Sequence, residues 1–430
     1  MHYLLLCRAI YIQVIIPKRT LSTFAKTKKE PMSKNHLSDR LSLINESATI
    51  RMAQLAREIS AQGNDVISLS LGEPDFDTPD HIKEAAKKAL DNGYTKYTPV
   101  PGHKEFVSAI IEKFKRDNDL HFSAEQIMVS CGAKQSIANL MAALVNPGDE
   151  VIIFTPYWVS YFDIVTMNGG VPVCVKAGID NDFKVTPSQL EEAITDKSKV
   201  VIFSSPCNPT GSMYSKEELH DLAKVIDSKP DLFVISDEIY EYINFDEKHV
   251  SIGSFDFMKD QVATVNGMAK GFAMTGWRIG YMGAPAWLAK ACSRIQSQVT
   301  SGAAAFSQIA SAHALMSDMT PTREMREAFR ERKHLMIKGL KDIPGIKTND
   351  PKGAFYIFPD VSSFFGKSNG EDTINNSTDF SELLLRKAFV ATVAGSAFGD
   401  SDCIRISYAA SDEQLIEALR RIKTFLADFS

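Results

Sequence analysis

The sequence predicts an α/β protein with a large domain, built on a mainly parallel central sheet between helices, and a smaller α+β domain formed from both chain ends. The chain has 430 residues. A domain with a single hydrophobic core is usually smaller than this, so two packed units are expected. Its central part alternates short apolar runs with helical patterns. The runs are apolar on both faces, which is typical of strands buried in a parallel sheet.

The large domain is assigned to residues 80–315. Its strands are predicted at 126–130, 150–154, 171–175, 200–204, 232–236 and 262–265, and its helices at 80–92, 134–144, around 191–193 and at 287–314. Pro79 stands near the first turn of the first helix, a position that suits proline. Polar candidate residues follow several of these strands, at the edge where parallel sheets bind ligands.

The smaller domain is expected to combine the two ends of the chain. Residues 32–79 form an N-terminal arm and part of this domain, with a polar helix at 37–62. Residues 316–430 supply the remainder, with helices at 321–340 and 412–425 and strands at 353–358 and 403–407.

Residues 1–31 are expected to lie outside the fold, either as a disordered extension or because the start is mis-assigned. The apolar segment 3–16 contains Arg8 and is too short to span a bilayer. A signal or transit peptide is the alternative, although no small-residue cleavage pattern is visible. Met32 opens a conventional-looking sequence, which favours the mis-assigned start.

Composition excludes several classes of function. Hydrophobic residues make up 44% and charged residues 23%, which are ordinary globular values. The net charge of −5 gives no electrostatic reason to expect nucleic acid or an acidic membrane as a partner. The six cysteines form no CxxC pair and show no zinc-like spacing, so we expect buried thiols in a reducing, cytoplasmic setting and no metal.

The most informative segment follows the strand at 262–265. Lys270 is flanked by glycines that let a ligand approach the backbone, and Arg278, whose planar fork suits phosphate, comes eight residues later. A lysine in a turn is usually a solvated charge. Partial burial among glycine, methionine and phenylalanine would instead lower the pKa of Lys270 and favour the free amine that forms an imine.

This segment resembles the lysine signature of the fold-type I, class I/II aminotransferases, and it is most similar to the bacterial aspartate aminotransferase branch. The resemblance extends from about residue 37 to about residue 425. It implies that Lys270 forms a Schiff base with pyridoxal 5′-phosphate (PLP) and that Arg278 binds the PLP phosphate. Ala269 is a departure, because many relatives have serine there as a further phosphate contact.

Two further motifs match residues that hold the PLP ring in this family. Asp237, after the strand at 232–236, matches the carboxylate that keeps the ring nitrogen protonated, and Tyr240 matches a hydrogen-bond donor to the ring's phenolic oxygen. Asn208, in the NPTG motif after the strand at 200–204, matches a second donor to that oxygen. Without the family context, both motifs read as ordinary turns.

The turn after the strand at 126–130 offers a phosphate seat, because Gly132 and Ala133 begin a helix whose free N–H groups attract anions. Lys134 resembles the lysine that meets a second substrate carboxylate in this branch; the alternative is a helix-start lysine facing phosphate or solvent. Trp158 matches the residue that stacks on the PLP ring, and the alternative is a core tryptophan.

Arg405 lies among apolar residues on the predicted strand 403–407, and a buried arginine needs an anion. An internal salt bridge is the alternative. The resemblance implies that Arg405 grips the substrate α-carboxylate, with the backbone of Gly72 nearby, and that Trp158, Asn208 and Lys134 also contact the substrate.

Tyr97 resembles a tyrosine that reaches the PLP phosphate of the neighbouring subunit. The alternative is a loop tyrosine packed on its own subunit. If the resemblance holds, the active sites lie at the interface of a homodimer.

These features predict a PLP-dependent aminotransferase that moves the amino group of aspartate, or a similar dicarboxylic amino acid, to 2-oxoglutarate by a ping-pong mechanism through Lys270. Prephenate or aromatic amino-acid transfer within the same branch is the first alternative, and a PLP-dependent β-lyase, decarboxylating or cyclising enzyme is the next. A PLP-binding transcription regulator would need a DNA-binding domain, for which the roughly 36 preceding residues are too few.

Overall fold

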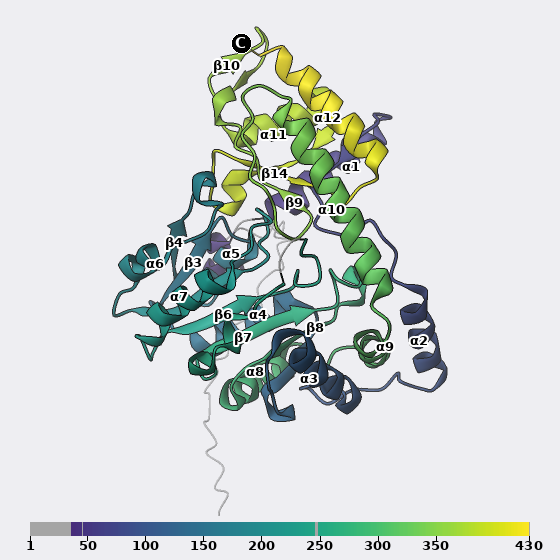
Figure 1. The fold of residues 1–430 in the computed structure, drawn as a ribbon, viewed down its shortest axis with the longest axis vertical. Coiled ribbons are helices and arrows are strands. Elements are labelled where there is room, and N and C mark those ends of the chain that lie inside the picture. Colours follow the sequence, from purple (N-terminus) through teal and green to yellow (C-terminus); the bar gives the residue numbers. More distant parts are fainter. Residues whose placement is uncertain (1–35, 45, 246–247, 430) are drawn as a thin grey trace, which may run out of the picture. The chain divides into compact units, whose positions relative to one another are not determined.

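A seven-stranded sheet organises the residues from Leu43 to Ser430, which form one compact unit separate from Met1–Ser42 (Figure 1). The computed structural model describes residues 36–44, 46–245 and 248–429, so the predicted extension 1–31 lies outside the described residues. The strand order is β2-β8-β7-β6-β5-β3-β4. The bounds are β2 (Ile127–Ser130), β3 (Glu150–Thr155), β4 (Val171–Lys176), β5 (Ser198–Ser204), β6 (Phe233–Asp237), β7 (Val262–Gly267) and β8 (Gly280–Gly283).

The sheet is mainly parallel, as predicted. Neighbouring strands from β4 to β7 run parallel, and β8 alone runs antiparallel to both of its neighbours, β7 and β2. All six apolar runs of the sequence became strands of this sheet. The sequence did not indicate β8, because two of its four residues are glycine, which favours strands weakly.

Helices cover both faces of the sheet (Figure 1). One face packs against α4 (Ala133–Leu144), α5 (Ser160–Met167) and α8 (Ala286–Val299). The opposite face packs against a larger set, which comprises α2 (Asp80–Asp91), α3 (Lys104–Asn118), α6 (Pro187–Ala193), α7 (Lys216–Asp227) and α9 (Ala305–Met316). Because both faces are covered, the strands other than the edge strand β4 are buried almost throughout, which explains their continuous apolar sequences.

A second group of elements surrounds its own core and joins both ends of the compact unit. Strand β1 (Ile67–Ser68) pairs in parallel with β12 (Val390–Ala391). Three further strands form a sheet of order β13-β14-β9. Its members are β13 (Val393–Ala394), β14 (Ile404–Ser407) and β9 (Tyr356–Ile357), with β10 (Lys367–Ser368) and β11 (Thr373–Ile374) as a separate pair.

The helices of this group are α1 (Ala48–Ala61), α10 (Thr320–Lys341), α11 (Ser377–Ala388) and α12 (Asp412–Ala427). Figure 1 shows α10 and α12, which contact each other, beside the small sheet. The predicted domain boundaries at 79/80 and 315/316 remain predictions. None of the helices in the described part of the chain is both long and apolar enough to cross a membrane.

Three predicted elements are shorter or divided. The helix expected at 37–62 begins at Ala48, since the preceding turn Asp39–Leu43 buries no residue that could stabilise it. The stretch 287–314 is two helices, because the left-handed conformation of Ser301, with φ of 58°, interrupts it. The strand at 353–358 is reduced to Tyr356–Ile357, since Ala354 also has a positive φ of 58°.

Candidate active site

A cavity of about 280 Å³ opens at the carboxyl ends of the central strands. Ser204 and Asp237, the last residues of β5 and β6, both line it. The structure brings all the predicted site residues except Tyr97 to this cavity. They are Gly72, Gly132, Ala133, Lys134, Trp158, Asn208, Asp237, Tyr240, Lys270, Arg278 and Arg405.

Lys270 lies in the turn after β7, and its ammonium group donates a hydrogen bond to the carbonyl oxygen of Gly72. The rings of Tyr240 and Phe355 each have their centroid 5.8 Å from Nζ. Burial, with the positive charges of Arg405 and Arg278 nearby, lowers the pKa of Lys270 to about 8. A substantial fraction of free amine is therefore present near neutral pH, as a nucleophilic lysine requires.

Asp237 is buried at the end of β6 with its carboxylate held at both oxygens. The hydroxyl of Tyr161 donates to Oδ2 at 2.7 Å, and the N–H of Ile239 donates to Oδ1 at 3.2 Å. Burial raises the pKa of Asp237 to about 6, although the Tyr161 bond opposes the rise. A buried carboxylate of this kind is stabilised by a cationic ligand group placed against it.

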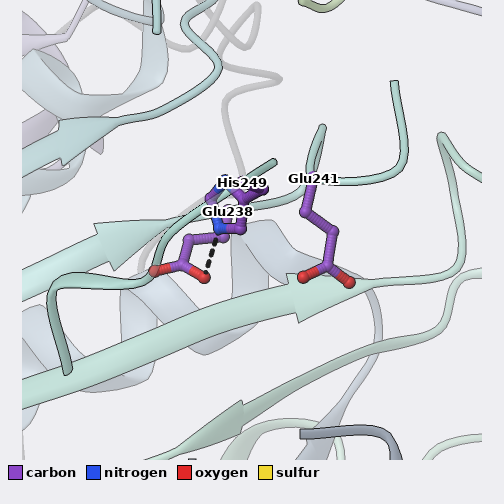
Figure 2. A group of neighbouring side chains, drawn as sticks. All are labelled: Glu238, Glu241 and His249. Atoms are coloured by element: carbon purple, nitrogen blue, oxygen red, sulfur yellow. Dashed lines mark hydrogen bonds and ion pairs between the residues drawn. The ribbon is translucent and has the colours of Figure 1, made fainter. Parts of the chain in front are cut away.

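Behind the carboxyl end of β6, the buried side chains of Glu238, Glu241 and His249 lie together, with metal-ligand atoms within 4.8 Å of one another (Figure 2). His249 Nε2 lies 2.9 Å from Glu238 Oε2. The hydroxyls of Ser236 and Ser251 donate to Glu238 Oε1 at 2.9 and 2.6 Å. Both oxygens of Glu238 thus already have hydrogen-bonding partners.

The other carboxylate of this group, Glu241, forms an ion pair with the buried Lys113. Asn118 donates to Glu241 Oε2 at 2.7 Å and accepts from Lys113 Nζ at 2.7 Å. The ammonium of Lys113 therefore supplies the positive charge that a metal ion would bring. Because the two glutamates belong to the turn that carries Asp237 and Tyr240, the network fixes that turn from behind.

Arg405, on β14, is buried and only partly satisfied. Its Nη1 donates to Asn208 Oδ1 at 3.0 Å and its Nη2 to the carbonyl of Ser70 at 2.6 Å. Among the described residues, Nε of Arg405 has no hydrogen-bond partner. Burial lowers the pKa of Arg405, so the charged form is costly there until an anion binds. The alternative prediction for Arg405 was an internal salt bridge. The hydrogen-bond partners of its guanidinium are instead the neutral oxygens of Asn208 and Ser70.

The turn after β2 and the turn before β8 together form an anion cradle. Gly132 has φ of 91°, which glycine adopts freely, and α4 begins directly after it. Arg278 also has a left-handed backbone, with φ of 59°, an uncommon conformation for a residue with a side chain. Its Nη1 donates to the carbonyl of Thr275 at 2.8 Å. An added Cβ at Gly132 would come 2.6 Å from Arg278 Nη2 and displace the guanidinium, and the positive φ also disfavours any other residue there.

These sequence and structural features agree with the comparison with known protein families. The pattern of "Aminotransferase class I and II" matches residues 64–422. The chain belongs to this family. An aspartate/prephenate aminotransferase of Cereibacter sphaeroides is 46% identical over 404 residues, covering 92% of this chain and 99% of that protein. A Petunia hybrida protein, described as a bifunctional aspartate aminotransferase and glutamate/aspartate-prephenate aminotransferase, is 45% identical over 91% of this chain and 82% of its own length.

Solved structures agree with the fold of this aminotransferase. The aspartate aminotransferase of Rhizobium meliloti superimposes with a TM-score of 0.89 at 42% identity, covering 92% of this chain and 99% of its own. The Thermus thermophilus aspartate aminotransferase crystallised with maleate gives a TM-score of 0.86 at 40% identity, covering 91% and 99%. The chain is therefore a fold-type I aminotransferase.

Two further predicted residues of this aminotransferase, Lys134 and Tyr97, differ in whether they reach the cavity. Lys134 Nζ lies 4.9 Å from the ring centroid of Trp158. Burial, together with the charge of Arg278, lowers the pKa of Lys134. Tyr97 does not line the cavity, and its side chain is fully exposed in the single chain, at 101%. The predicted contact of Tyr97 with a partner subunit is not tested by a single chain.

Several residues in and around the cavity were not anticipated from the sequence. Tyr161 holds Asp237 from α5, and Tyr356 contacts Tyr240 from β9. The cavity is also lined by residues at the start of α1, namely Ser47, Thr49 and Ile50. Each comes from a segment far along the chain from its partner. The only sequence signal was the aromatic cluster around Trp158, which includes Tyr161 but does not reveal its role.

Proposed function

We propose that this aminotransferase holds PLP on Lys270 and moves the amino group of aspartate, or a similar dicarboxylic amino acid, to 2-oxoglutarate. The observation that carries the proposal is the position of Lys270, Asp237 and Arg278 around one cavity of about 280 Å³. A basic amine, a buried carboxylate and an anion cradle are the three groups that PLP needs. Membership of the family supports the class of reaction.

The cradle fits the phosphate end of PLP. Gly132 leaves open the space in front of Arg278, which any side chain at position 132 would enter. The N–H of Ala133 stands at the start of α4, where the helix dipole favours an anion. We assign Gly132, Ala133 and Arg278 to the phosphate.

The opposite end fits the pyridine ring. Asp237 would pair with the protonated ring nitrogen, which supplies the cationic ligand that its buried carboxylate lacks. Asn208 accepts from Arg405 through Oδ1, so its Nδ2 group is the one available to donate to the ring's phenolic oxygen. Tyr240 would donate to the same oxygen, and Trp158 would stack on the ring face.

Bound PLP supplies an electron-poor ring that draws electrons from the substrate α-carbon. Once the amino group of the substrate has displaced it from PLP, the free Lys270 amine would take the proton from that carbon and hold it for return; the lowered pKa of about 8 favours this free amine. Arg405 binds the α-carboxylate and so fixes which bond of the α-carbon faces the ring. The first product leaves before the second substrate enters, because both use Arg405, and this order gives ping-pong kinetics.

The preference for a dicarboxylic substrate rests on Lys134. Its ammonium group lies at the cavity, over Trp158, where a second carboxylate could pair with it. The Thermus thermophilus relative was crystallised with maleate, a dicarboxylate. Prephenate is the second candidate, since it also carries two carboxylates and two relatives are named for transferring to it.

We extend the proposal to assembly and location. Full exposure of Tyr97 supports a homodimer in which this tyrosine reaches the PLP phosphate of the partner subunit. The five cysteines within the described residues are unpaired, which supports a reducing, cytoplasmic setting.

A panel of amino donors tests the function. Aspartate, alanine and phenylalanine are each assayed with 2-oxoglutarate, glutamate is assayed with oxaloacetate, and glutamate and aspartate are also assayed with prephenate. We expect the highest kcat/KM for aspartate with 2-oxoglutarate and parallel lines in double-reciprocal plots. A higher kcat/KM with prephenate would favour the second candidate, and no transfer with any pair would refute the proposal.

A further inference from the structure

Tyr356 lies between Tyr240 and Arg405, to which the proposed function gives separate roles at the PLP ring and at the substrate carboxylate. It is on β9, where it pairs with Ser407 of β14, two residues from Arg405. The side chain is fully buried and lines the cavity. Its hydroxyl faces Tyr240, and its ring faces the guanidinium of Arg405. One side chain thus contacts both the ring-oxygen donor and the carboxylate grip.

The hydroxyl of Tyr356 lies 2.8 Å from that of Tyr240. Burial raises the pKa of both phenols, so each keeps its single proton at neutral pH. If Tyr240 donates its proton to the phenolic oxygen of PLP, the hydrogen bond between the two tyrosines must take its proton from Tyr356. Tyr356 then orients the Tyr240 hydroxyl and strengthens its donation, because linked hydrogen bonds polarise one another.

The space around the Tyr356 hydroxyl is kept clear by Gly72. An added Cβ at Gly72 would lie 2.6 Å from the Tyr356 oxygen. The carbonyl of the same glycine accepts from Lys270. The absence of a side chain at residue 72 therefore lets this loop approach the Tyr356 hydroxyl while its carbonyl binds Lys270.

The ring of Tyr356 contacts the guanidinium of Arg405. Its centroid lies 4.6 Å from Cζ of Arg405, and the ring of Phe398 lies 5.0 Å from the same atom. Cation–π contacts of this kind stabilise a guanidinium that burial otherwise disfavours. They also hold its plane while Nη1 and Nη2 bond to Asn208 and Ser70.

Resting on the proposed function, we infer that Tyr356 is a positioning residue with two separable roles. Its hydroxyl orients the proton of Tyr240 toward the phenolic oxygen of PLP, and its ring orients Arg405 for the substrate carboxylate. The two roles predict different consequences for removing the hydroxyl and for removing the ring.

The hydroxyl is tested by the pH at which the visible absorbance of enzyme-bound PLP changes. A donor to the phenolic oxygen favours its unprotonated form, so weakening that donor moves the transition to higher pH. We expect Tyr240→Phe to raise it by about 1–2 pH units, and Tyr356→Phe by about 0.2–0.6 pH unit. Because Tyr356 acts through Tyr240, the double variant should match Tyr240→Phe alone.

The matched control is Tyr408→Phe. Tyr408 is also fully buried, and its hydroxyl donates to the carbonyl of Ala354 at 3.4 Å instead of to Tyr240. This variant should leave the transition where it is in the unaltered enzyme. The role of the hydroxyl would be overturned if Tyr356→Phe shifted the absorbance transition equally in the unaltered enzyme and in the Tyr240→Phe variant. It would also be overturned if Tyr356→Phe did not shift the transition at all.

The ring is tested by titrating the holoenzyme with maleate, an unreactive dicarboxylate. Tyr356→Phe retains the ring and should leave the dissociation constant within twofold, whereas Tyr356→Leu should raise it by about 5- to 30-fold. Tyr356→Met repeats the test with a side chain of larger volume if leucine destabilises the protein. Equal affinity for maleate in the Phe and Leu or Met variants would overturn the role of the ring.

Failure of this inference and failure of the proposed function are distinguishable. If the unaltered enzyme shows no visible band with PLP, the proposed function is wrong. If it shows the band and the Tyr356 variants behave as the control does, the proposed function stands and the inference is wrong.

Discussion

The two walls of the cavity hold their charged groups in different ways. The sheet wall comprises Gly132, Asp237, Lys270 and Arg278, which stand at the ends of strands of the central sheet. Its anion cradle combines the exposed Arg278 with the backbone at the start of α4. The opposing wall centres on Arg405, which is buried, stacked on aromatic rings and left with a free Nε–H among the described residues.

This difference matches two kinds of ligand. A cradle fixed by two turns suits a group that stays bound through many turnovers. A buried guanidinium with an unused donor suits a carboxylate that arrives and leaves in each half-reaction, because every arrival relieves the cost of burying the charge. Variants in the sheet wall should therefore change the bound cofactor, and variants of Arg405 itself should change substrate affinity alone.

The largest effect is expected at Lys270, the sheet-wall residue that both attaches PLP and carries the proton. Lys270→Ala should lower kcat by about 10⁴-fold or more and abolish the visible absorbance of the imine between PLP and the protein near neutral pH. The absorbance spectrum and steady-state rates measure these effects. PLP that remains attached to the variant after borohydride reduction would mean that another residue forms the imine.

Arg405→Lys tests the opposing wall. The bidentate grip is lost, at a cost of roughly 2–4 kcal/mol, so KM should rise about 30- to 900-fold for every amino donor. The absorbance of bound PLP should not change, since no sheet-wall residue is altered. A rise confined to dicarboxylic donors would contradict the assignment of Arg405 to the α-carboxylate.

Asp237→Asn should separate stability from cofactor binding. The pKa of Asp237 is raised from 3.8 to about 6 in the folded protein, so the folded state binds more protons than the unfolded state between these values. The stability of the PLP-free protein therefore falls as pH rises through this window, by up to about 3 kcal/mol in total. Asparagine has no charge to bury and should remove this fall.

Urea unfolding at pH 5 and pH 8 measures the effect. PLP-free Asp237→Asn should be more stable than the unaltered protein at pH 8, and the gain should be about halved at pH 5. Its affinity for PLP should drop, because the ring nitrogen loses its counter-charge. A variant that is less stable at both pH values would show that the Asp237 carboxylate is not strained by burial.

Lys134→Ala concerns substrate choice and should have a smaller effect. Loss of one partly exposed ion pair should lower kcat/KM for aspartate by about 5- to 10-fold relative to a neutral amino acid such as alanine. The ratio of the two specificity constants is the measurement. Equal losses for both donors would remove the argument for a dicarboxylate preference.

The smallest effect is expected at Tyr97, which belongs to neither wall of its own chain. Tyr97→Phe should weaken PLP binding by about 2- to 10-fold through loss of one hydrogen bond from the partner subunit. Mixing Lys270→Ala chains with Tyr97→Phe chains should produce hybrid dimers with one site that has both residues intact. A PLP affinity that Tyr97→Phe leaves unchanged would remove this tyrosine from the site.

The sheet wall was more predictable from the sequence than the opposing wall. Its residues lie in short motifs directly after apolar strands, so local patterns placed Gly132, Asp237 and Lys270 at the ends of strands, and the family resemblance supplied their roles. The contacts of Arg405 depend on segments far away in the chain, and no local pattern pointed to Ser70 or Tyr356.

The helices and strands were likewise predictable where a local sequence signal marks them. Continuously apolar strands were found because burial on both faces marks them, whereas the glycine-rich strand β8 was missed. Helix α7 was not predicted although Ser215 and Glu218 form a capping box at its start, a signal that sequence inspection could have used. The break at Ser301 was missed although Gly302 follows it, and a Ser-Gly step is a turn signal that sequence inspection could also have used.

The pairing of β1 with β12 bears on how the protein is made. Ser70, just after β1, and Arg405 are 335 positions apart, so the ribosome has released most of the chain before these partners can meet. A nascent chain that stops after β8 would contain every strand of the central sheet. It would lack Arg405, the residue proposed to bind the substrate carboxylate. Closure of so long a loop comes late in synthesis, and acquisition of substrate affinity should be the last event of folding.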